Sequence, residues 1–561
     1  MRNTLKYTFL SAVFLGFVAC DVDNTLPEIK GESENTVALN AGSADFSNYV
    51  ALGASFTAGF TDNALFIAGQ ENSFPNTMAK KFAMIGGGTF TQPLMSDNYG
   101  GLILGGSPVL TNPLDPSTRL FNERLVLTPN EPGKSPALLP VPLKSVNPAA
   151  MSTTDFALNN PTGPFKNLGV PGAKSTHFIA PGLGALANFP AANPYAIRVA
   201  GNTNSSLMEL FVAQTPTFFS LSEFGGNDVL GYATTGGDGT NPITTTATFN
   251  FALSKVEEGL KATGAKGVVA NLPYITSLPH FTTVPFNPLD PTTNATLAGQ
   301  IPLLNRVYGA VNQIYVGAGE SERSIVFSTT GANSTVIYDE DATDLTVAIA
   351  TTLGASPTFV PFVESLGLPA AAAPLVAQLL GKQYGKARAA TANDLFVLPS
   401  SSVIGEVNMT HAGGLITQSG GLLPATLAGQ FSAEGVTLPL ADKWVLTPQE
   451  QTEIKTAVDA YNGSLKAMAD TNGYAFVDLN SVLQQASVSG IEFDTYNMST
   501  SLVTGGLVGL DGVHLTGRGY ALMANKMLEA IDKTYGSNFV GAKDGLAKAN
   551  DYPTNYSPTL Q

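Results

Sequence analysis

Four short apolar runs, each about the length of one strand, constrain the fold more than any other feature of the sequence. They are residues 48–53 (NYVALG), 217–224 (TFFSLSEF), 267–272 (GVVANL) and 474–479 (YAFVDL). Runs that are apolar on both faces are typical of buried strands in a parallel sheet. Helical patterns accompany them, over residues 248–263, over 447–470 and from Thr516 onwards. Strands that alternate with helices predict an α/β fold with a central parallel sheet.

The helix signals strengthen this expectation. Thr447-Pro448-Gln449-Glu450 is a capping box with proline at the first helical position, and Gly473 is placed to end that helix. Thr516 is placed to begin a last helix whose apolar residues recur at helical spacing. We therefore expect three layers, in which helices cover both faces of the sheet.

The length and the distribution of glycine and proline bear on domain organisation. The chain has 561 residues, 44% of them hydrophobic, which is enough to bury a large core. Segments rich in Gly and Pro at about 86–164 and 329–446 separate the strand and helix signals. We expect a single domain over residues 45–561 that carries these two segments as insertions. The net charge of -15 argues against nucleic acid as a partner.

The first twenty residues have the pattern of an export signal. Arg2 and Lys6 precede an apolar stretch at 9–18, which is too short to span a bilayer. Phe17-Val18-Ala19-Cys20 resembles the lipobox of bacterial lipoproteins, in which the cysteine is acylated. The only cysteine of the chain stands at this junction. The pattern predicts a signal peptide at 1–19, lipidation of Cys20, a polar tether at 20–44 and a lipid anchor in the bacterial envelope, at the outer membrane. The alternative is an ordinary secretory signal with an incidental cysteine.

Four short motifs carry residue types that suit chemistry. The first strand leads into Gly53-Ala54-Ser55, so a hydroxyl stands at the carboxyl end of a parallel strand, where α/β folds bind ligands. The others are Asn167-Leu168-Gly169-Val170-Pro171-Gly172, Gly225-Gly226-Asn227-Asp228 after the second run, and Asp511-Gly512-Val513-His514 before the last helix.

Together the four blocks resemble the SGNH, or GDSL-type, hydrolases, which are named after Ser, Gly, Asn and His. Here these are Ser55, Gly172, Asn227 and His514, in the same order. The resemblance extends to Asn271-Leu272-Pro273 and to Val477-Asp478, but not to the insertions. It implies a flavodoxin-like three-layer fold and a serine ester hydrolase. The family's first block usually reads Gly-Asp-Ser, whereas this chain has Ala54 in the Asp position. In the family that Asp helps to fix the nucleophile loop but is not one of the four named residues, so the mechanism stays possible, and whether activity is lower is left open.

The chemistry of ester cleavage explains these residue types. A serine hydroxyl is a weak nucleophile until a base removes its proton, and histidine is suited to that task near neutral pH. His514 is therefore the expected base for Ser55, and Asp511 is expected to orient its ring and stabilise its charged form. The expected oxyanion hole consists of the backbone N–H groups of Ser55 and Gly172 and the side-chain amide of Asn227. Asp228 is interpreted as structural.

No cofactor and no metal ion are expected, because no two histidines stand at ligand spacing and the only cysteine lies at the export signal. The acidic run from Asp339 to Asp344 lacks the spacing of a calcium loop and is interpreted as a solvated turn. The remaining histidines are interpreted as loop or surface residues, with the second near the rim of the cleft: His177, His280 and His411.

The second insertion contains many apolar residues between Phe359 and Leu380, and these cannot all face water. One interpretation is a helical subdomain that packs on the core; the other is a lid or acyl-chain groove over Ser55, which would indicate lipid or long-chain esters. The leading function is an esterase or lipase acting on an ester-containing small molecule or lipid. Two alternatives stay open: a carbohydrate O-acetyl esterase acting on acetylated glycan, and a non-catalytic surface lipoprotein that binds lipid or glycan. The oligomeric state is not predicted.

Overall fold

The computed structural model describes residues 37–115, 118–130 and 138–561. The predicted signal peptide and the lipidation of Cys20 lie outside the described residues. Residues 37–44, at the end of the predicted tether, contact the last helix: Ser43 N–H donates to Tyr535 O, and Asn538 donates to Ala38 O. The predicted tether therefore stops short of residue 44, because its last residues already belong to the folded body.

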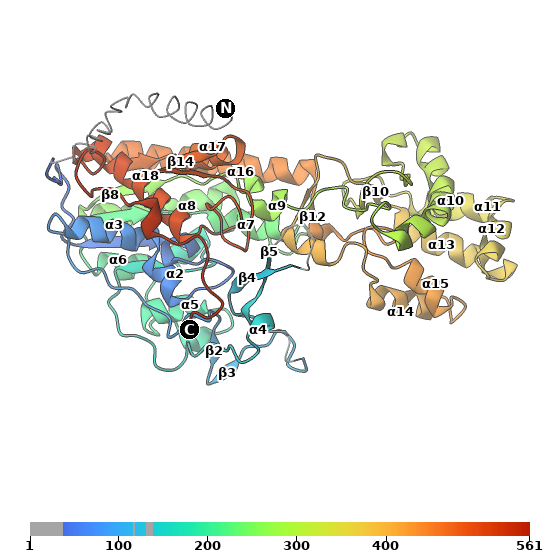
Figure 1. Ribbon diagram of the computed structural model, residues 1–561, viewed down its shortest axis with the longest axis horizontal. Coiled ribbons are helices and arrows are strands. Elements are labelled where there is room, and N and C mark those ends of the chain that lie inside the picture. The colour runs from blue at the N-terminus through green and yellow to red at the C-terminus, as the bar shows by residue number, and fades with distance from the viewer. Residues whose placement is uncertain (1–36, 116–117, 131–137) are drawn as a thin grey trace, which may run out of the picture.

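A five-stranded sheet forms the centre of that body (Figure 1). Every neighbouring pair is parallel, and the spatial order is β13-β8-β7-β1-β6. Numbered along the chain, the order is 5-4-3-1-2, one of the two common orders of doubly wound sheets. The strands are β1 (Tyr49–Gly53), β6 (Asn167–Gly169), β7 (Phe218–Leu221), β8 (Lys266–Ala270) and β13 (Ala475–Val477). The predicted parallel α/β sheet is thus confirmed, with β6 as a strand that the sequence did not reveal.

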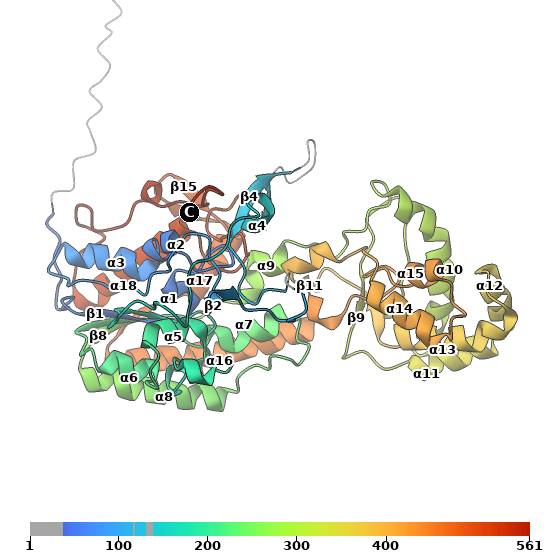
Figure 2. The same ribbon diagram turned by 90° about the horizontal axis from the view of Figure 1, so that it is seen from below.

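Helices cover both faces of the sheet, as expected for three layers. Figure 2 shows α3 (Phe74–Ala83) and α18 (Gly517–Tyr535) on one face. The opposite face is covered by α6 (Leu207–Val212), α8 (Thr246–Thr263) and α16 (Pro448–Asn472). At the start of α16, Thr447 Oγ1 accepts the N–H of Glu450, whose carboxylate accepts the N–H of Thr447. The predicted capping box is confirmed, and such a cap contributes about 1 kcal/mol.

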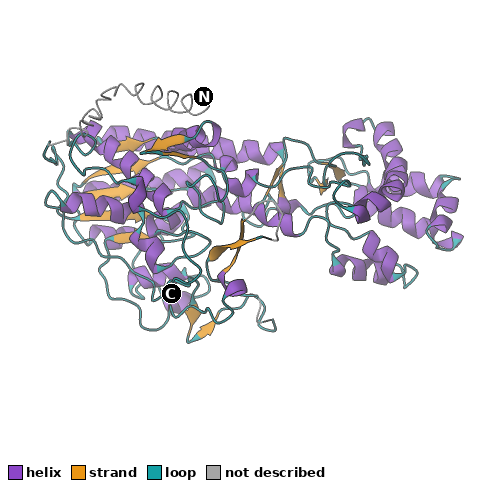
Figure 3. Ribbon diagram, in the orientation of Figure 1, coloured by secondary structure: helices purple, strands orange, loops and turns teal. Residues whose placement is uncertain are grey.

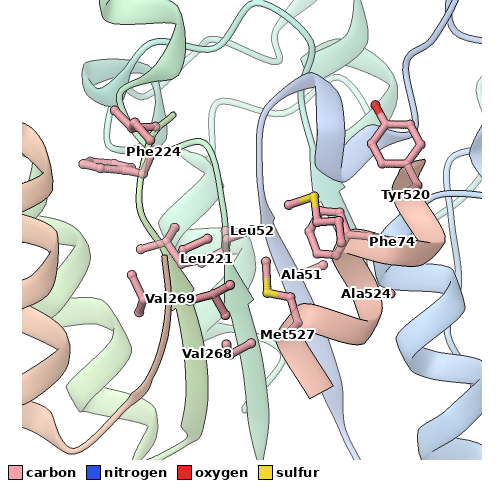
Figure 4. Close-up of a cluster of buried hydrophobic side chains, with 14 of the residues drawn as sticks. Ala51, Leu52, Phe74, Leu221, Phe224, Val268, Val269, Tyr520, Ala524 and Met527 are labelled. Carbon is pink, nitrogen blue, oxygen red and sulfur yellow. The ribbon is translucent and has the colours of Figure 1, made fainter. Parts of the chain in front are cut away.

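The core lies between these layers. In Figure 4, Ala51 and Val268 of the sheet lie on the side of Met527 of α18, whereas their neighbours Leu52, Leu221 and Val269 point to the opposite face. All five residues of β1 are buried, which is why its sequence is apolar on both faces. The sheet is therefore a rigid, fully covered platform for the residues at its carboxyl edge.

A second, helical lobe projects from the body (Figures 1 and 3). It has its own apolar core, made of buried residues between Leu289 and Val436. Its helices are α10 (Ala295–Gly317), α11 (Thr346–Ala355), α12 (Phe359–Ser365), α13 (Ala373–Tyr384), α14 (Met409–Gln418) and α15 (Ala425–Gln430). The lobe therefore begins before residue 329, because α10 packs in its core rather than on the sheet.

The helices expected in the second insertion are present, but they do not pack on the core of the body, since Phe359, Val363 and Leu380 are buried in the lobe's own core. Among the described residues, no single helix has the length and hydropathy to cross a membrane. The helices α11 and α12 reach these criteria only as a pair that bends by 91°.

The first insertion, around 86–164, contains two small hairpins: β2 (Ile103–Leu104) with β3 (Ser107–Pro108), and β4 (Leu125–Pro129) with β5 (Leu138–Pro142). Its anchor is Arg124, which is fully buried and donates to Asn98 O, Tyr556 O and Ser557 O. This guanidinium thus ties the insertion to the C-terminal residues of the chain.

Candidate active site

The strand order places a crevice beside β1, where the direction of winding reverses between β1 and β7. Ligands bind at this switch point in doubly wound sheets, outside the carboxyl ends of the strands. Ser55 follows β1 directly, and Asn227 lies just after β7, in the first turn of α7 (Gly226–Thr234). Two of the predicted site residues are therefore brought to the position that the fold favours for a ligand.

Ser55 begins a short helix, α1 (Ser55–Ala58), directly after the strand. The turn into it is tight: a Cβ at Gly53 would lie 1.9 Å from Thr57 Oγ1 and 2.8 Å from Ser222 O, so only glycine fits there. Ser55 is 8% exposed, and among the described residues its backbone N–H donates to no other group. The serine is therefore enclosed but keeps one free donor.

A carboxylate holds this turn in place. Glu223 Oε2 accepts the N–H of Ala54 at 3.0 Å and of Phe56 at 2.8 Å, and Oε1 accepts the N–H and hydroxyl of Thr57 at 3.1 and 2.9 Å. Burial raises the pKa of Glu223, while these hydrogen bonds act in the opposite direction. The N–H groups on both sides of Ser55 are thus occupied, whereas its own N–H is not.

Glu223 was not expected from the sequence, where it is only the seventh residue of an apolar run. Its φ is 53°, in the left-handed region that non-glycine residues rarely adopt, so its backbone is strained to aim the side chain at the turn. The positive φ and the distant partners left no signal in the sequence. The serine turn therefore does not lack a supporting carboxylate although Ala54 stands in the Asp position, because Glu223 from the turn after β7 supplies one.

His514 and Asp511 form the predicted pair. Nδ1 of His514 lies 2.9 Å from Asp511 Oδ2, and Asp511 also accepts the N–H groups of Val513, His514 and Asn63. Burial raises the pKa of Asp511. The charge and hydrogen bond of His514 and the two N–H groups of its own loop outweigh this effect and lower the pKa to about 2. The carboxylate is therefore ionised at neutral pH and fixes the ring by Nδ1, which leaves Nε2 for a substrate or nucleophile.

The histidine ring lies beside the serine turn. The ring centroids of Phe56 and Phe60 lie 5.6 Å and 4.6 Å from that of His514. Within the described part of the chain, no hydrogen bond joins the ring to Ser55 Oγ; in ligand-free enzymes this bond is commonly long and tightens when substrate binds. The fold thus brings His514, near the end of the chain, next to the turn that follows β1, as the sequence interpretation requires.

Asp62 is a further buried acid beside this pair. Its Oδ1 accepts the N–H of Leu510 at 2.9 Å. Burial raises its pKa to about 7, and Asp511 contributes in the same direction, whereas the Leu510 N–H, Arg124 and His514 lower it. Asp62 supports the loop that carries Asp511, and sequence reasoning missed it because it stands in no motif.

Gly172 and Asn227 are neighbours, because Asn227 is hydrogen-bonded to Ala173, the residue after Gly172. Asn227 Nδ2 donates to Ala173 O at 3.0 Å, which leaves its second N–H free, and the N–H of Gly172 donates to no described residue. Asp228 is 1% exposed and accepts the N–H and hydroxyl of Ser175, so it joins the two blocks and has the structural role expected of it. Free donors from Ser55, Gly172 and Asn227 are what an oxyanion hole requires.

An apolar pocket extends from Ser55 (about 960 Å³ including its open mouth). Its lining comes from the carboxyl ends of β1, β7 and β8, from α18 and from α17 (Leu479–Val488). The polar lining residues are Ser55, Ser222, Glu223, Asn227 and Asn271, and the others are apolar or glycine. No residue between 329 and 446 lines it, so the expectation of a lid or acyl groove made by that insertion is wrong: its apolar side chains are used in the core of the lobe.

The other histidines do not lie at open loop or surface positions, because each stands in a helical turn and is partly buried. His280 Nδ1 is 3.3 Å from Asp511 O, so this ring packs against the loop that carries the His514–Asp511 pair. His177 Nδ1 accepts the N–H of Lys174, and His411 Nδ1 is 2.8 Å from Ser432 Oγ in the lobe. Burial lowers the pKa of all three rings.

Comparisons with protein-family models, with curated proteins and with solved structures found no match for this chain.

Proposed function

We propose that this chain is a serine ester hydrolase of the SGNH type, with a flavodoxin-like fold, that acts on lipids or other esters of longer acyl chains. The observation that carries the proposal is the pairing of His514 with Asp511 at 2.9 Å, directly beside the turn of Ser55. A serine, an oriented histidine and free donors in one crevice fit acyl transfer better than simple binding.

In the proposed reaction, Ser55 Oγ attacks the ester carbonyl carbon and its proton passes to His514 Nε2. The carbonyl oxygen becomes an oxyanion that accepts hydrogen bonds from the N–H groups of Ser55 and Gly172 and from Asn227. Each such donor is worth about 3 kcal/mol in the barrier. The imidazolium then gives its proton to the departing alcohol oxygen, and water hydrolyses the acyl-enzyme by the reverse sequence of proton transfers.

The pocket supports an acyl substrate. Apolar side chains such as Leu272, Leu483 and Leu522 line it, and an acyl chain gains about 0.8 kcal/mol for each methylene that it buries. This favours a lipid or acyl ester over an acetylated glycan, whose hydroxyls would need polar partners. We also propose that the protein is exported and held at the bacterial envelope by a lipid on Cys20, where such substrates occur.

The test is hydrolysis of p-nitrophenyl acetate, butyrate and octanoate by the full-length chain. We expect higher kcat/KM with longer acyl chains, and a loss of at least about a thousandfold in Ser55→Ala. Ser489→Ala, an exposed serine on the same body, is the matched control. A preference for acetate and for acetylated glycan would indicate a deacetylase instead, and no turnover by folded protein would indicate a binding protein.

A further inference from the structure

Three carboxylates from separate segments meet where the lobe joins the body. They belong to Glu340, which follows β9 (Val336–Tyr338) of the lobe, to Asp442 on the return to the body, and to Glu450 in the first turn of α16. One carboxylate oxygen of each lies within 4.8 Å of the others. The acidic run from Asp339 to Asp344 is thus divided: Asp339 pairs with Arg388 and Asp344 caps its own turn at Thr346, while Glu340 joins the cluster.

One carboxylate oxygen of each residue in the cluster has no hydrogen-bond donor among the described residues. Glu340 Oε2, Asp442 Oδ1 and Glu450 Oε1 are buried and unpartnered among the described residues. Glu450 is 2% exposed, and only its other oxygen is used, by the capping box at Thr447. A buried carboxylate oxygen without a donor is costly, so three that converge require a positive ligand.

The surrounding backbone is shaped to admit this convergence. A Cβ at Gly237 would lie 1.8 Å from Glu450 Oε1, and Gly237 adopts a φ of +77° that favours glycine. No ion pair to Lys or Arg involves the three acids in the described residues. The nearby titratable groups are three further acids, Asp238, Asp341 and Glu453, and two lysines. Lys386 donates to the backbone O of Glu340, and Lys443 lies over the ring of Trp444.

Burial and the neighbouring carboxylates raise the pKa of both Asp442 and Glu450. Protons are therefore the competing ligand. A proton bridges only two oxygens, however, whereas a cation contacts all three.

We propose that Glu340, Asp442 and Glu450 bind a hard divalent cation, for which Ca²⁺ is the best fit. Ca²⁺ takes oxygen ligands at about 2.3–2.6 Å, so two oxygens that share the ion stand no more than about 5 Å apart, a limit that the three oxygens satisfy. Ca²⁺ also accepts irregular carboxylate geometry, whereas Mg²⁺ demands a near-ideal octahedron. The cation fixes the lobe to the body, because its ligands come from the lobe, from the connection and from α16. This site is independent of the proposed ester hydrolysis.

The experiment uses the full chain after removal of metals with EDTA. It is titrated calorimetrically with CaCl₂ and then MgCl₂, and its melting temperature is measured with and without each ion. We expect a single Ca²⁺ per chain, tighter than Mg²⁺, and a melting temperature that rises by several degrees with Ca²⁺. Absence of binding and of any thermal shift with both ions would overturn the site in favour of shared protons, and tighter binding of Mg²⁺ would overturn the choice of Ca²⁺.

Two variants within the same acidic run localise the effect. Glu340→Gln is expected to weaken Ca²⁺ binding at least tenfold, whereas Asp344→Asn, outside the cluster, leaves it unchanged. Without metal, Glu340→Gln should melt no lower than the wild type, because it relieves repulsion among the carboxylates. Unaltered Ca²⁺ binding in a folded Glu340→Gln variant would contradict the proposal. Glu450→Gln is expected to weaken Ca²⁺ binding in the same way, but it also alters the capping box of α16. Glu209→Gln, in the similar capping box of α6, is the control for that effect.

Discussion

Glu223 Oε2 accepts the backbone N–H of Phe56 at 2.8 Å, so a carboxylate at the end of one strand positions the serine that follows its neighbour. The strands β1 and β7 are paired, but these residues are separated by 167 positions in the sequence. Glu223 touches no reacting atom in the proposed reaction and is therefore a positioning residue.

Glu223→Gln should lower kcat about 10–100-fold with little change in KM. Glutamine keeps one acceptor oxygen and turns a donor toward N–H groups, so about half of the hydrogen bonds to the turn are lost, at a cost of about 2 kcal/mol in stability. Steady-state kinetics on p-nitrophenyl esters and a thermal melt measure both effects. Glu209→Gln, whose carboxylate also binds backbone N–H, is the control. Unchanged kcat in Glu223→Gln would show that the turn does not depend on this carboxylate.

Asp511→Asn should reduce kcat about 10³–10⁴-fold, because an amide can donate to Nδ1 and so favour the wrong tautomer of His514. The measurement is kcat at neutral pH, with circular dichroism to establish that the variant is folded. Asp532→Asn is the matched control, since Asp532 also accepts backbone N–H groups, of Phe539 and Val540, but lies at the far end of α18. If both variants lose activity equally, Asp511 has no special role.

Asp62→Asn should stabilise the protein more as the pH rises from about 4 to about 7. Burial raises the pKa of Asp62 from 3.8 to about 7 in the folded chain, so between these values the folded state keeps a proton that the unfolded state has released. The free energy of unfolding of the wild type therefore falls through this range, and asparagine, which mimics the protonated acid, avoids the loss. Urea unfolding of both proteins across the range measures the difference. A constant difference would mean that Asp62 does not titrate there.

Val482→Trp should reduce kcat/KM for p-nitrophenyl octanoate about a hundredfold and change that for the acetate little. Val482 lines the pocket, and an indole there would displace about four methylenes of the acyl chain, each worth about 0.8 kcal/mol. Val488→Trp on the same helix, at a position 83% exposed, is the control. Equal losses on both esters would place the acyl chain elsewhere.

The sequence predicted those parts of the fold that leave a local or periodic signal. The four strand runs, the capping box at Thr447 and the N-cap at Thr516 are present as expected. The strand β6 was missed because its sequence, Asn-Leu-Gly, holds a single apolar side chain and so forms no apolar run. The extent of the lobe was missed because α10 is an ordinary amphipathic helix whose packing partner cannot be known from its own residues.

The site divides in the same way. The predicted site residues stand in short blocks of the sequence. In the fold, Ser55 and Asn227 line one pocket, and the paired His514 and Asp511 lie beside the turn of Ser55, where the His514 ring contacts that of Phe56. Gly172 adjoins Ala173, whose carbonyl accepts a hydrogen bond from Asn227. The roles of Glu223, Asp62 and the cluster at Glu340 depend on contacts between segments that are distant in the sequence. No motif surrounds any of these carboxylates, so the sequence did not indicate their roles. The lid interpretation was wrong for a related reason. Apolar residues in the sequence indicate that a segment is buried, but not which surface it packs against.

The central claim is that Ser55 is an activated nucleophile. The most direct measurement is labelling of the folded chain with a fluorophosphonate, followed by mass spectrometry of the peptides, alongside Ser55→Ala and His514→Ala. The account predicts a phosphonyl group on Ser55 in the wild type, none in Ser55→Ala and strongly slowed labelling in His514→Ala. Absence of label from folded wild-type protein, or label on another residue that persists in Ser55→Ala, would contradict it.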